Sequence, residues 1–459
     1  LGVSLYNLLD HYKNYKKGRV YLRAKKIKKF EPALDATGLK GFGLIYDTNI
    51  DDARLTVETI KEAVHSGRCT AVNYARVTRL NHDESTGKVN GAWFVDEDPD
   101  TATSTRETLV RAPLVVNSTG IWTDELLDNV PEGYPDPVIR PTKGVHVVFK
   151  KKDVPVNNAL GITSHIDGRF FFVLDRDNFI VIGTTDTDYH GDLGEPRCTA
   201  EDAEYLLSTV RMKFPDANLD LENMVGSYAG IRPLARPPAK KGKPASESEV
   251  SRDHEIIRST DDLISICGGK LTTFRVMAED LMLGPVKSIA TELLPSREFN
   301  WKKKIAKQPY KISLTRDEWD DTPLVQECKE MGYITDEQCK HLYQQYGRGA
   351  LVILHYIKED ETLAERLVPA EDVTYAPWIM AEIKYVVLHD CPTHLTDIMA
   401  RRLEFQWCVH PSFQPGASKK VARFVASLLD WDESRVNREV NDYMEYLAYN
   451  SFFYDGKLE

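Results

Sequence analysis

Residues 264–275 read Ile264-Ser265-Ile266-Cys267-Gly268-Gly269-Lys270-Leu271-Thr272-Thr273-Phe274-Arg275, and this stretch decides the fold. A buried strand is predicted over residues 263–267, and a helix follows the two glycines directly. Glycines at such a junction let the backbone approach a ligand closely, while the helix N-terminus and Lys270 favour negative charge there. A plain strand-to-helix turn with a surface lysine explains Gly-Gly-Lys equally well, and the spacing is not that of a P-loop.

A second junction of this kind lies upstream. A strand predicted over residues 109–116 ends in Asn117-Ser118-Thr119-Gly120-Ile121-Trp122, and a helix is expected over residues 123–127. Strand, small-residue turn and helix form the arrangement in which backbone N–H groups meet the phosphates of a cofactor. The two junctions together predict an α/β cofactor-binding unit.

The rest of the chain divides into a β-rich and a helical part. We predict strands over residues 145–149, 170–174, 179–185 and 224–230, which suggest an antiparallel sheet, and a helix over 201–214. Asp51 or Asp52 is expected to cap a helix that Gly67 ends, and Asn90-Gly91 to form a hairpin turn. The periodicity becomes helical after a boundary near residues 300–315.

Composition excludes several classes of protein. The 459 residues carry 59 Lys and Arg against 70 Asp and Glu, a net charge of −11, which argues against general nucleic-acid binding. The seven cysteines lack a C-x-x-C pair, so we expect reduced thiols, and no apolar run approaches the ~18 residues of a spanning helix. No metal-ligand spacing is present. The basic residues 13–29, with Tyr15 and Tyr21, predict a solvated face, with a membrane or nucleic-acid patch as the alternative.

Three cations at or before the Gly268-Gly269 junction indicate an anionic ligand. Arg232 precedes a proline and is expected in a short turn after a strand, Arg252 follows a polar loop, and Lys270 lies in Gly-Gly-Lys. A guanidinium offers a planar fork suited to phosphate or carboxylate, although a salt bridge at a domain edge explains a single arginine as well. We infer a small phosphorylated substrate.

His146 is the histidine with the most informative position. Alternation within its strand places it on the opposite face from Val145 and Val147, where it is either a core residue or a general base. Four others are expected at the surface: His65, His82, His190 and His341.

Seven motifs occur in one order along the chain, and a helical tail follows them. They are residues 51–55, 117–120, 140–146, 182–186, 229–234, 251–255 and 268–273, followed by Asp397-x-x-x-Arg401-Arg402 in the tail. The series closely resembles FAD-dependent glycerol-3-phosphate dehydrogenase, and the resemblance covers nearly the whole chain.

The resemblance implies a three-part fold. It implies an α/β FAD-binding domain of the glutathione-reductase and D-amino-acid-oxidase type, an antiparallel β-sheet substrate domain and a C-terminal α-helical domain. We expect the FAD-binding domain over residues 48–135 and 225–300, the substrate domain over 1–47 and 136–224, and the helical domain over 310–459.

The resemblance also implies site residues. His146, Arg232 and Lys270 are the expected catalytic residues, and Arg232, Arg252 and Lys270 the expected substrate ligands. The expected FAD contacts are Arg76, Val77, Ser118, Thr119, Gly120, Trp122, Gly230, Gly268, Gly269, Lys270, Leu271 and Thr272.

The implied reaction is oxidation of sn-glycerol 3-phosphate to dihydroxyacetone phosphate, with a hydride passing to flavin N5. The related oxidases tend to carry a long insertion near residues 237–251, where this sequence has a short loop. A quinone is therefore the expected acceptor, and an oxidase that reduces O2 to peroxide is the alternative. Oxidation of an amine or a 2-hydroxy acid is disfavoured because a carboxylate requires one cation rather than three. The expected location is cytoplasmic, compatible with peripheral contact at the inner face of the cell membrane or, in a eukaryote, the mitochondrial inner membrane, and with a homo-oligomer.

One feature of the family pattern is not found in this sequence. The family begins with a strand, a G-x-G-x-x-G turn and a helix, whereas Gly38, Gly41 and Gly43 lack that spacing. We therefore expect an N-terminal βαβ unit of at least ~30 residues upstream of Leu1. A non-catalytic scaffold is the alternative.

Overall fold

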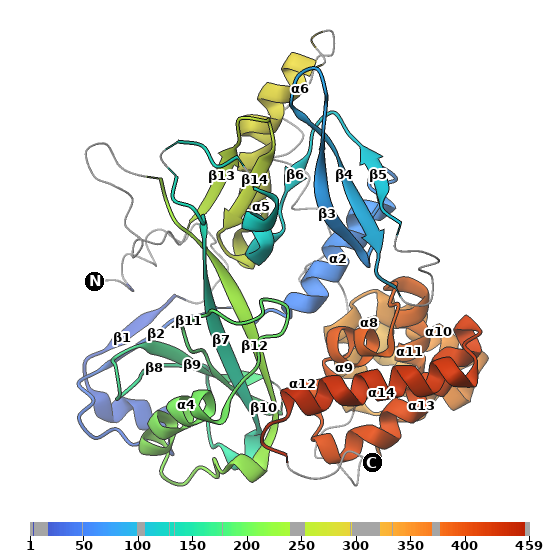
Figure 1. Cartoon of the computed structure of the whole chain (residues 1–459). Coiled ribbons are helices and arrows are strands. Elements are labelled where there is room, and N and C mark those ends of the chain that lie inside the picture. The colour runs from blue at the N-terminus through green and yellow to red at the C-terminus, as the bar shows by residue number, and fades with distance from the viewer. Residues whose placement is uncertain are drawn as a thin grey trace.

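The computed structural model describes most of the chain. It describes residue 3 and residues 17–47, 49–98, 106–127, 129–132, 134–176, 178–238, 253–293, 295, 322–332, 334–369 and 377–454. Figure 1 shows a β-rich half in blue and green, an upper part with two small sheets, and a group of orange and red helices.

A six-stranded antiparallel sheet forms the centre of the β-rich half. Its order is β11-β7-β10-β9-β8, and β12 also pairs with β7. The long strands β7 and β12 connect the upper and lower parts of the molecule (Figure 1). The strands are β7 (Ile139–Lys150), β8 (Leu160–Thr163), β9 (Phe170–Arg176), β10 (Phe179–Gly183), β11 (Thr187–Asp188) and β12 (Met224–Ala235).

The two faces of this sheet pack against different layers. Val147 and Ile180 contribute to a core shared with helix α4 (Ala200–Lys213), whereas Val148, Val181 and Val225 join the core of the C-terminal helices. Strand alternation explains this division, because neighbouring residues of a strand point to opposite faces. Smaller elements complete this half: β1 (Arg19–Tyr21), η1 (Ala24–Lys29), β2 (Phe42–Leu44), η3 (Lys151–Asp153) and η4 (Leu221–Asn223).

The upper part holds two three-stranded sheets. One has the order β13-β14-β6, with β6 parallel to β14, and the other the order β3-β4-β5. Helix α2 (Asp52–His65) begins at Asp51, whose carboxylate accepts a hydrogen bond from the backbone N–H of Arg54, which confirms the predicted cap. The remaining elements are β3 (Ala75–His82), β4 (Val89–Asp96), β5 (Thr108–Arg111), β6 (Val116–Asn117), η2 (Gly120–Trp122), α3 (Thr123–Leu126), β13 (His254–Arg258), β14 (Ile264–Gly268), η5 (Leu271–Thr273), α5 (Phe274–Leu281), η6 (Met282–Val286) and α6 (Lys287–Leu293).

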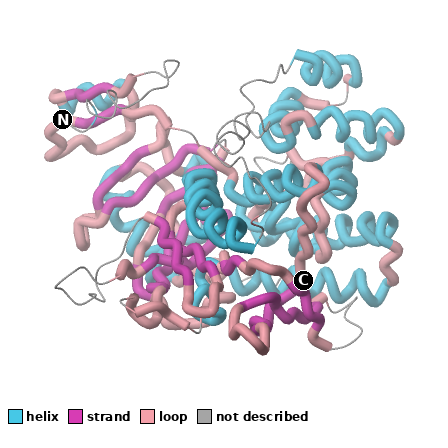
Figure 2. Tube along the Cα trace, turned by 90° about the horizontal axis from the view of Figure 1, so that it is seen from above, coloured by secondary structure: helices cyan, strands magenta, loops and turns pink. Residues whose placement is uncertain are grey.

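The C-terminal part is helical, and Figure 2 shows its helices gathered on one side of the strands. In the part of the chain described, no helix is long and apolar enough to cross a bilayer. The elements are α8 (Thr322–Met331), α9 (Asp336–Tyr346), α10 (Gly349–Glu359), η9 (Glu361–Ala364), α11 (Met380–His389), η10 (Asp397–Arg402), α12 (Phe405–Cys408), η11 (Pro411–Phe413), α13 (Gln414–Leu429) and α14 (Glu433–Asn450).

Two local predictions are wrong, and the domain limits stay predictions. The Asn90-Gly91 pair lies inside β4, because the turn forms earlier, where Asp83 accepts hydrogen bonds from the backbone of Ser85 and Thr86. His341 is buried, with Nε2 2.8 Å from Oε2 of Glu382.

Candidate functional site

His146 lies in the middle of a row of three residues across the large sheet. Its β7 position pairs with Gly183 of β10 on one side and with Tyr228 of β12 on the other. The imidazole and the Tyr228 ring are stacked, with centroids 4.7 Å apart and planes at 15°. A Cβ at Gly183 would collide with the imidazole, so the absence of a side chain there makes room for the ring. Alternation places His146 opposite Val145 and Val147, as predicted.

The environment of His146 favours a neutral imidazole. Burial, together with the nearby charge of Arg232, lowers the pKa of His146 to about 4, well below the ordinary ~6.5. Among the described residues, no hydrogen bond occupies either ring nitrogen. The ring is therefore unprotonated near pH 7 and can accept a proton from a ligand.

Arg232 lies on the same face, two register positions beyond a pair of glycines. Gly144 and Gly230 are directly opposite each other, between the His146–Tyr228 pair and the Thr142–Arg232 pair. The Arg232 guanidinium covers Gly144, since a Cβ there would be 2.5 Å from Nη2, whereas the space above Gly230 is open. Gly230 thus forms an open floor between a neutral base and a cation.

The Arg232 guanidinium is fixed by the hydrogen bonds that it donates to a neighbouring loop. Nη2 donates to Oγ1 of Thr184 and to the carbonyl of Thr185, each at 3.0 Å, and Nη1 lies 3.3 Å from Oδ1 of Asp186. The side chain is one third exposed, so part of the fork faces solvent. The prediction that Arg232 lies in a turn is wrong, because Arg232 and Pro233 continue β12 opposite Thr142 and Pro141.

The two predicted cofactor turns meet at one edge of the β13-β14-β6 sheet. Because β6 and β14 are parallel, their C-terminal ends and the turns that follow lie at the same edge. The buried Asn117 amide donates to Oγ of Ser265 at 3.2 Å and to the carbonyl of Thr123 at 3.0 Å. This side chain therefore fixes the first turn to the strand that carries the second.

The backbone of both turns fits a dinucleotide such as FAD. Gly120, Gly268 and Gly269 have φ values of +63°, +71° and +71°, a region that favours glycine, and helical turns follow them. Trp122 and Leu271 are each 42% exposed, so each turn carries an apolar side chain with accessible surface. Exposed backbone at the carboxyl ends of parallel strands, flanked by apolar surface, suits a flavin nucleotide.

The remaining predicted residues are more dispersed. Lys270 is exposed two residues after β14, a strand of a different sheet from that of His146 and Arg232. Arg76 and Val77 lie on β3, where the Arg76 side chain pairs with Glu97. Arg252 and most of the 237–251 loop lie outside the described residues.

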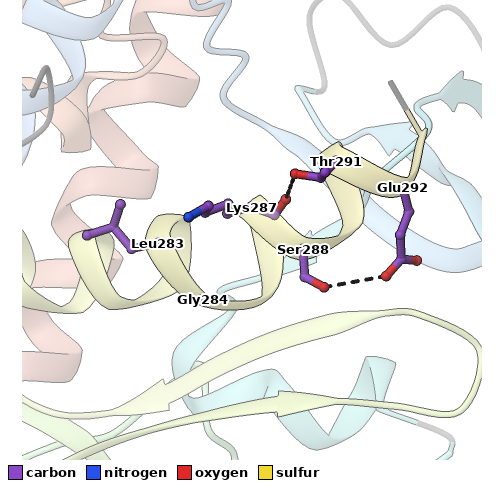
Figure 3. A pocket seen from close by; sticks show the side chains of 6 residues that line it. All are labelled: Leu283, Gly284, Lys287, Ser288, Thr291 and Glu292. Atoms are coloured by element: carbon purple, nitrogen blue, oxygen red, sulfur yellow. Dashed lines mark hydrogen bonds between the residues drawn. The ribbon is translucent and has the colours of Figure 1, made fainter. Parts of the chain in front are cut away.

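Two hollows lie away from this face. One, shown in Figure 3, runs along η6 and α6 and includes Lys287 and Glu292, with the Ser288 hydroxyl donating to Glu292 at 3.4 Å. The other, of about 640 Å³, lies between the η1–β2 segment and the edge strand β8. Neither contains a predicted site residue, so neither changes the location of the candidate site.

Sequence reasoning missed three contributors to this face. Tyr228 stacks on His146, while Thr184 and Asp186 hold Arg232. The period of two in a strand could have found Tyr228, because Tyr228, Gly230 and Arg232 necessarily share one face. No comparable sequence signal links Thr184 and Asp186 to Arg232, because that contact depends on how β10 leaves the sheet.

Comparisons with known proteins cover nearly the whole chain. The family described as FAD dependent oxidoreductase matches residues 4–275, and the C-terminal domain of alpha-glycerophosphate oxidase matches residues 312–436. The chain is 30% identical to glycerol-3-phosphate dehydrogenase 2 of Mycobacterium tuberculosis, over 96% of this chain and 70% of the relative. It is 28% identical to alpha-glycerophosphate oxidase of Streptococcus pyogenes, over 96% of this chain and 77% of that protein.

A solved structure agrees with the fold. The glycerol-3-phosphate dehydrogenase of Bacillus halodurans complexed with FAD has a TM-score of 0.74 and 28% identity, covering 96% of this chain and 84% of that chain. The predicted fold class, a FAD-binding unit with an antiparallel sheet domain and a helical C-terminal domain, is confirmed, as is FAD as the cofactor of the family. The chain belongs to the family of FAD-dependent glycerol-3-phosphate dehydrogenases and oxidases.

Proposed function

We propose that the protein oxidises sn-glycerol 3-phosphate to dihydroxyacetone phosphate with FAD and delivers the electrons to a quinone. The observation that carries the proposal is the face of β7 and β12 on which Arg232 and His146 flank the open floor at Gly230. A cation at one end and a neutral base at the other suit a small alcohol that carries a phosphate. The names of the relatives agree with this substrate class.

Arg232 is the proposed phosphate ligand. Its guanidinium is held by Thr184, Thr185 and Asp186, so little further side-chain entropy is lost when an anion binds. Arg252 and Lys270 are proposed as the second and third cations. Binding energy from the phosphate then orients the C2 hydroxyl of the substrate towards His146.

The proposed cofactor residues are those of the two turns. Ser118, Thr119, Gly120 and Trp122 would hold the pyrophosphate side, and Gly268 to Thr272 the flavin side, with Gly230, Arg76 and Val77 as further contacts. FAD, when bound, supplies the acceptor for a hydride. The chain itself supplies the backbone of these turns, and Trp122 and Leu271 would cover part of the bound cofactor.

His146 is the proposed general base. A ring nitrogen takes the proton of the C2 hydroxyl as the C2 hydrogen leaves with its electron pair, and the C2–O bond becomes a carbonyl. The substrate thus loses one hydride and one proton, which together make two electrons and two protons. A neutral imidazole is required for this step, and the environment of His146 keeps it neutral.

Anaerobic stopped-flow measurement of flavin reduction tests the reaction. We expect reduction by sn-glycerol 3-phosphate and at least ~100-fold slower reduction by glycerol or lactate, because both lack the phosphate that Arg232 binds. Calorimetric titration of dihydroxyacetone phosphate gives an independent measure of phosphate binding. Equal rates with lactate would favour a 2-hydroxy-acid oxidase, and no reduction by any of them would favour a scaffold.

The acceptor is tested in the same preparation. We expect reduction of a quinone analogue to exceed peroxide release under air. The opposite ratio would make the protein an oxidase, a function that relatives such as that of Streptococcus pyogenes carry in their names.

A basic surface on β1 and η1 suits contact with an anionic membrane. Leu22 is 85% exposed between these elements. A protruding leucine within a basic cluster is typical of surfaces that dock on anionic lipid, which supports peripheral membrane contact rather than a purely solvated face. The exposed cations are Lys17, Arg19, Arg23, Lys25, Lys26, Lys28 and Lys29.

Liposome sedimentation tests this surface. The protein should sediment with vesicles containing phosphatidylglycerol and stay in the supernatant with pure phosphatidylcholine. Leu22→Ser combined with Lys25→Glu should abolish binding, whereas Lys419→Glu, a change of an exposed lysine on α13, should not. Equal loss with Lys419→Glu would mean that net charge, rather than this surface, controls binding.

A further inference from the structure

We propose that Tyr228 is the positioning residue of His146. We further propose that the C-terminal helical unit, which comprises α8 to α14, holds Tyr228 in place through Trp407. The inference rests on the proposed function in one respect, that His146 acts as the base. It assigns to the helical unit a role in the site, although that unit supplies none of the proposed substrate or cofactor ligands.

The first step is the contact between the two rings. His146 and Tyr228 are cross-strand neighbours, stacked at 4.7 Å and 15°. On the other side of the row, Gly183 is so close that a methyl group would collide with the imidazole. The ring therefore lies over Gly183 and against Tyr228, which restricts its movement out of the row.

The second step leads from Tyr228 to the helical unit. The Trp407 ring of α12 lies 5.8 Å from the Tyr228 ring, at an angle of 43°. The Trp407 backbone also packs on β12, since a Cβ at Gly226 would be 2.5 Å from the Trp407 Cα. This close packing explains the glycine at position 226 and brings α12 directly beneath Tyr228.

The third step is the support of Trp407. The Arg176 guanidinium lies 4.8 Å from the centre of the Trp407 ring, within range of a cation–π interaction. Nη2 of Arg176 donates to both carboxylate oxygens of Glu404, at 2.9 and 2.8 Å, and lies 3.9 Å from Asp51 at the start of α2. Arg176, on which the Trp407 ring packs, is thus itself held by the segment before α12 and by the start of α2.

Two hydrogen bonds also fix β12 at Ser227, the residue before Tyr228. The Ser227 hydroxyl donates to the carbonyl of Asn450 at 2.7 Å, and the Gln406 amide donates to the carbonyl of Ser227 at 3.4 Å. The residue before Tyr228 is therefore attached to both α12 and the end of α14. A base displaced by about 1 Å can lose ~100-fold in rate, so this attachment matters for catalysis.

Histidine NMR tests the proposal without requiring turnover. The protein carries twelve histidines, and in protein labelled with 13C at Cε1 of histidine the His146 signal is identified by its loss in His146→Gln. Tyr228→Leu should move this signal and shift the pKa of His146 towards its ordinary value, whereas Tyr228→Phe, which keeps the stacked ring, should leave both unchanged. Trp407→Leu should act in the same direction as Tyr228→Leu.

Flavin reduction supplies the second readout. Tyr228→Leu and Trp407→Leu should each lower the maximal reduction rate by ~10- to 100-fold with little change in the substrate Kd, because they misplace the base and leave Arg232 intact. Trp431→Leu is the matched control, since Trp431 is a buried tryptophan of the same unit that stacks with Arg435 instead. If Trp407→Leu does not fold, the Tyr228 pair carries the test, and if Tyr228→Leu does not fold, the comparison of Trp407→Leu with Trp431→Leu carries it.

Several results would overturn the proposal. They are an unchanged His146 signal in Tyr228→Leu, equal effects of Tyr228→Phe and Tyr228→Leu, and a Trp431→Leu effect as large as that of Trp407→Leu. Failure of the proposed function is distinguishable, because His146→Gln would then keep the parent reduction rate while Tyr228→Leu still moved the His146 signal.

Discussion

The Arg54 guanidinium on α2 donates a 2.7 Å hydrogen bond to Oδ2 of Asp390 at the end of α11, and both side chains are buried. Lys61, two turns further along α2, donates to the other carboxylate oxygen at 2.8 Å. The rings of Tyr346 and Tyr385 lie 4.9 and 5.3 Å from these two cations. One carboxylate therefore pairs with two cations and attaches α2 to the helical unit.

Asp390→Ala should destabilise the protein by about 3–5 kcal/mol, because it leaves the buried Arg54 without its buried anion. Urea denaturation followed by circular dichroism measures the loss. Glu58→Ala removes a more exposed partner of the same arginine and should cost less than ~1 kcal/mol. Similar losses of unfolding free energy in both variants would show that burial of the Arg54–Asp390 pair does not add to stability.

Arg232→Ala should raise KM by ~10- to 100-fold, since a charge-assisted contact to phosphate contributes about 1.5–3 kcal/mol. The maximal rate of flavin reduction should change less, because His146 remains in place. Steady-state kinetics and calorimetry with dihydroxyacetone phosphate measure the two effects. Arg211→Ala, at an exposed pair with Glu204 on α4, should behave as the parent. A normal KM in Arg232→Ala would exclude Arg232 as the phosphate ligand.

His146 should make the stability of the protein depend on pH. Its folded pKa of about 4 lies below the unfolded ~6.5, so between these values the unfolded chain binds a proton that the folded chain does not. Its contribution is therefore complete above pH 6.5 and decreases as the pH falls, by about 3 kcal/mol between pH 7 and pH 4. Urea denaturation of the parent and His146→Gln at both pH values should show a difference that shrinks on acidification, while His190→Gln, at an exposed position, should follow the parent.

His146→Gln should also lower the rate of flavin reduction more than it raises KM, because the substrate keeps its phosphate ligand. Stopped-flow traces at saturating sn-glycerol 3-phosphate give the rate directly. A parent-like rate would remove His146 from the mechanism without affecting the stability prediction.

Gly183→Ala should displace the imidazole, because the added methyl group occupies its present position. We expect at least ~10-fold slower flavin reduction and a loss of about 1–3 kcal/mol from overpacking. Gly416→Ala on α13 is the control, since nothing lies within 4 Å of its added methyl and a helix interior favours alanine. Reduction at the parent rate in Gly183→Ala would show that the ring can move without cost.

Local patterns in the sequence predicted the elements that carry the site. Asp51 caps α2, the run before Gly268 is a strand, and His146 faces away from Val145, because each depends only on neighbouring residues. The pattern does not predict the turn at Asp83, because the hydrogen bonds that the Asp83 side chain accepts outweigh the hairpin tendency of Asn-Gly. His341 was placed at the surface because its partner, Glu382, is distant in sequence.

The sequence by itself determined the motifs, the strand periodicity and the cations of the site, since these follow from residue type and spacing. Only the tertiary structure decided that Tyr228 and Gly183 flank His146, that Trp407 contacts Tyr228, and that Thr184 and Asp186 hold Arg232. The physical reason is that strand register, and the packing of the helical unit on β12, set contacts between residues far apart in the sequence, such as Ser227 and Asn450, which are 223 residues apart.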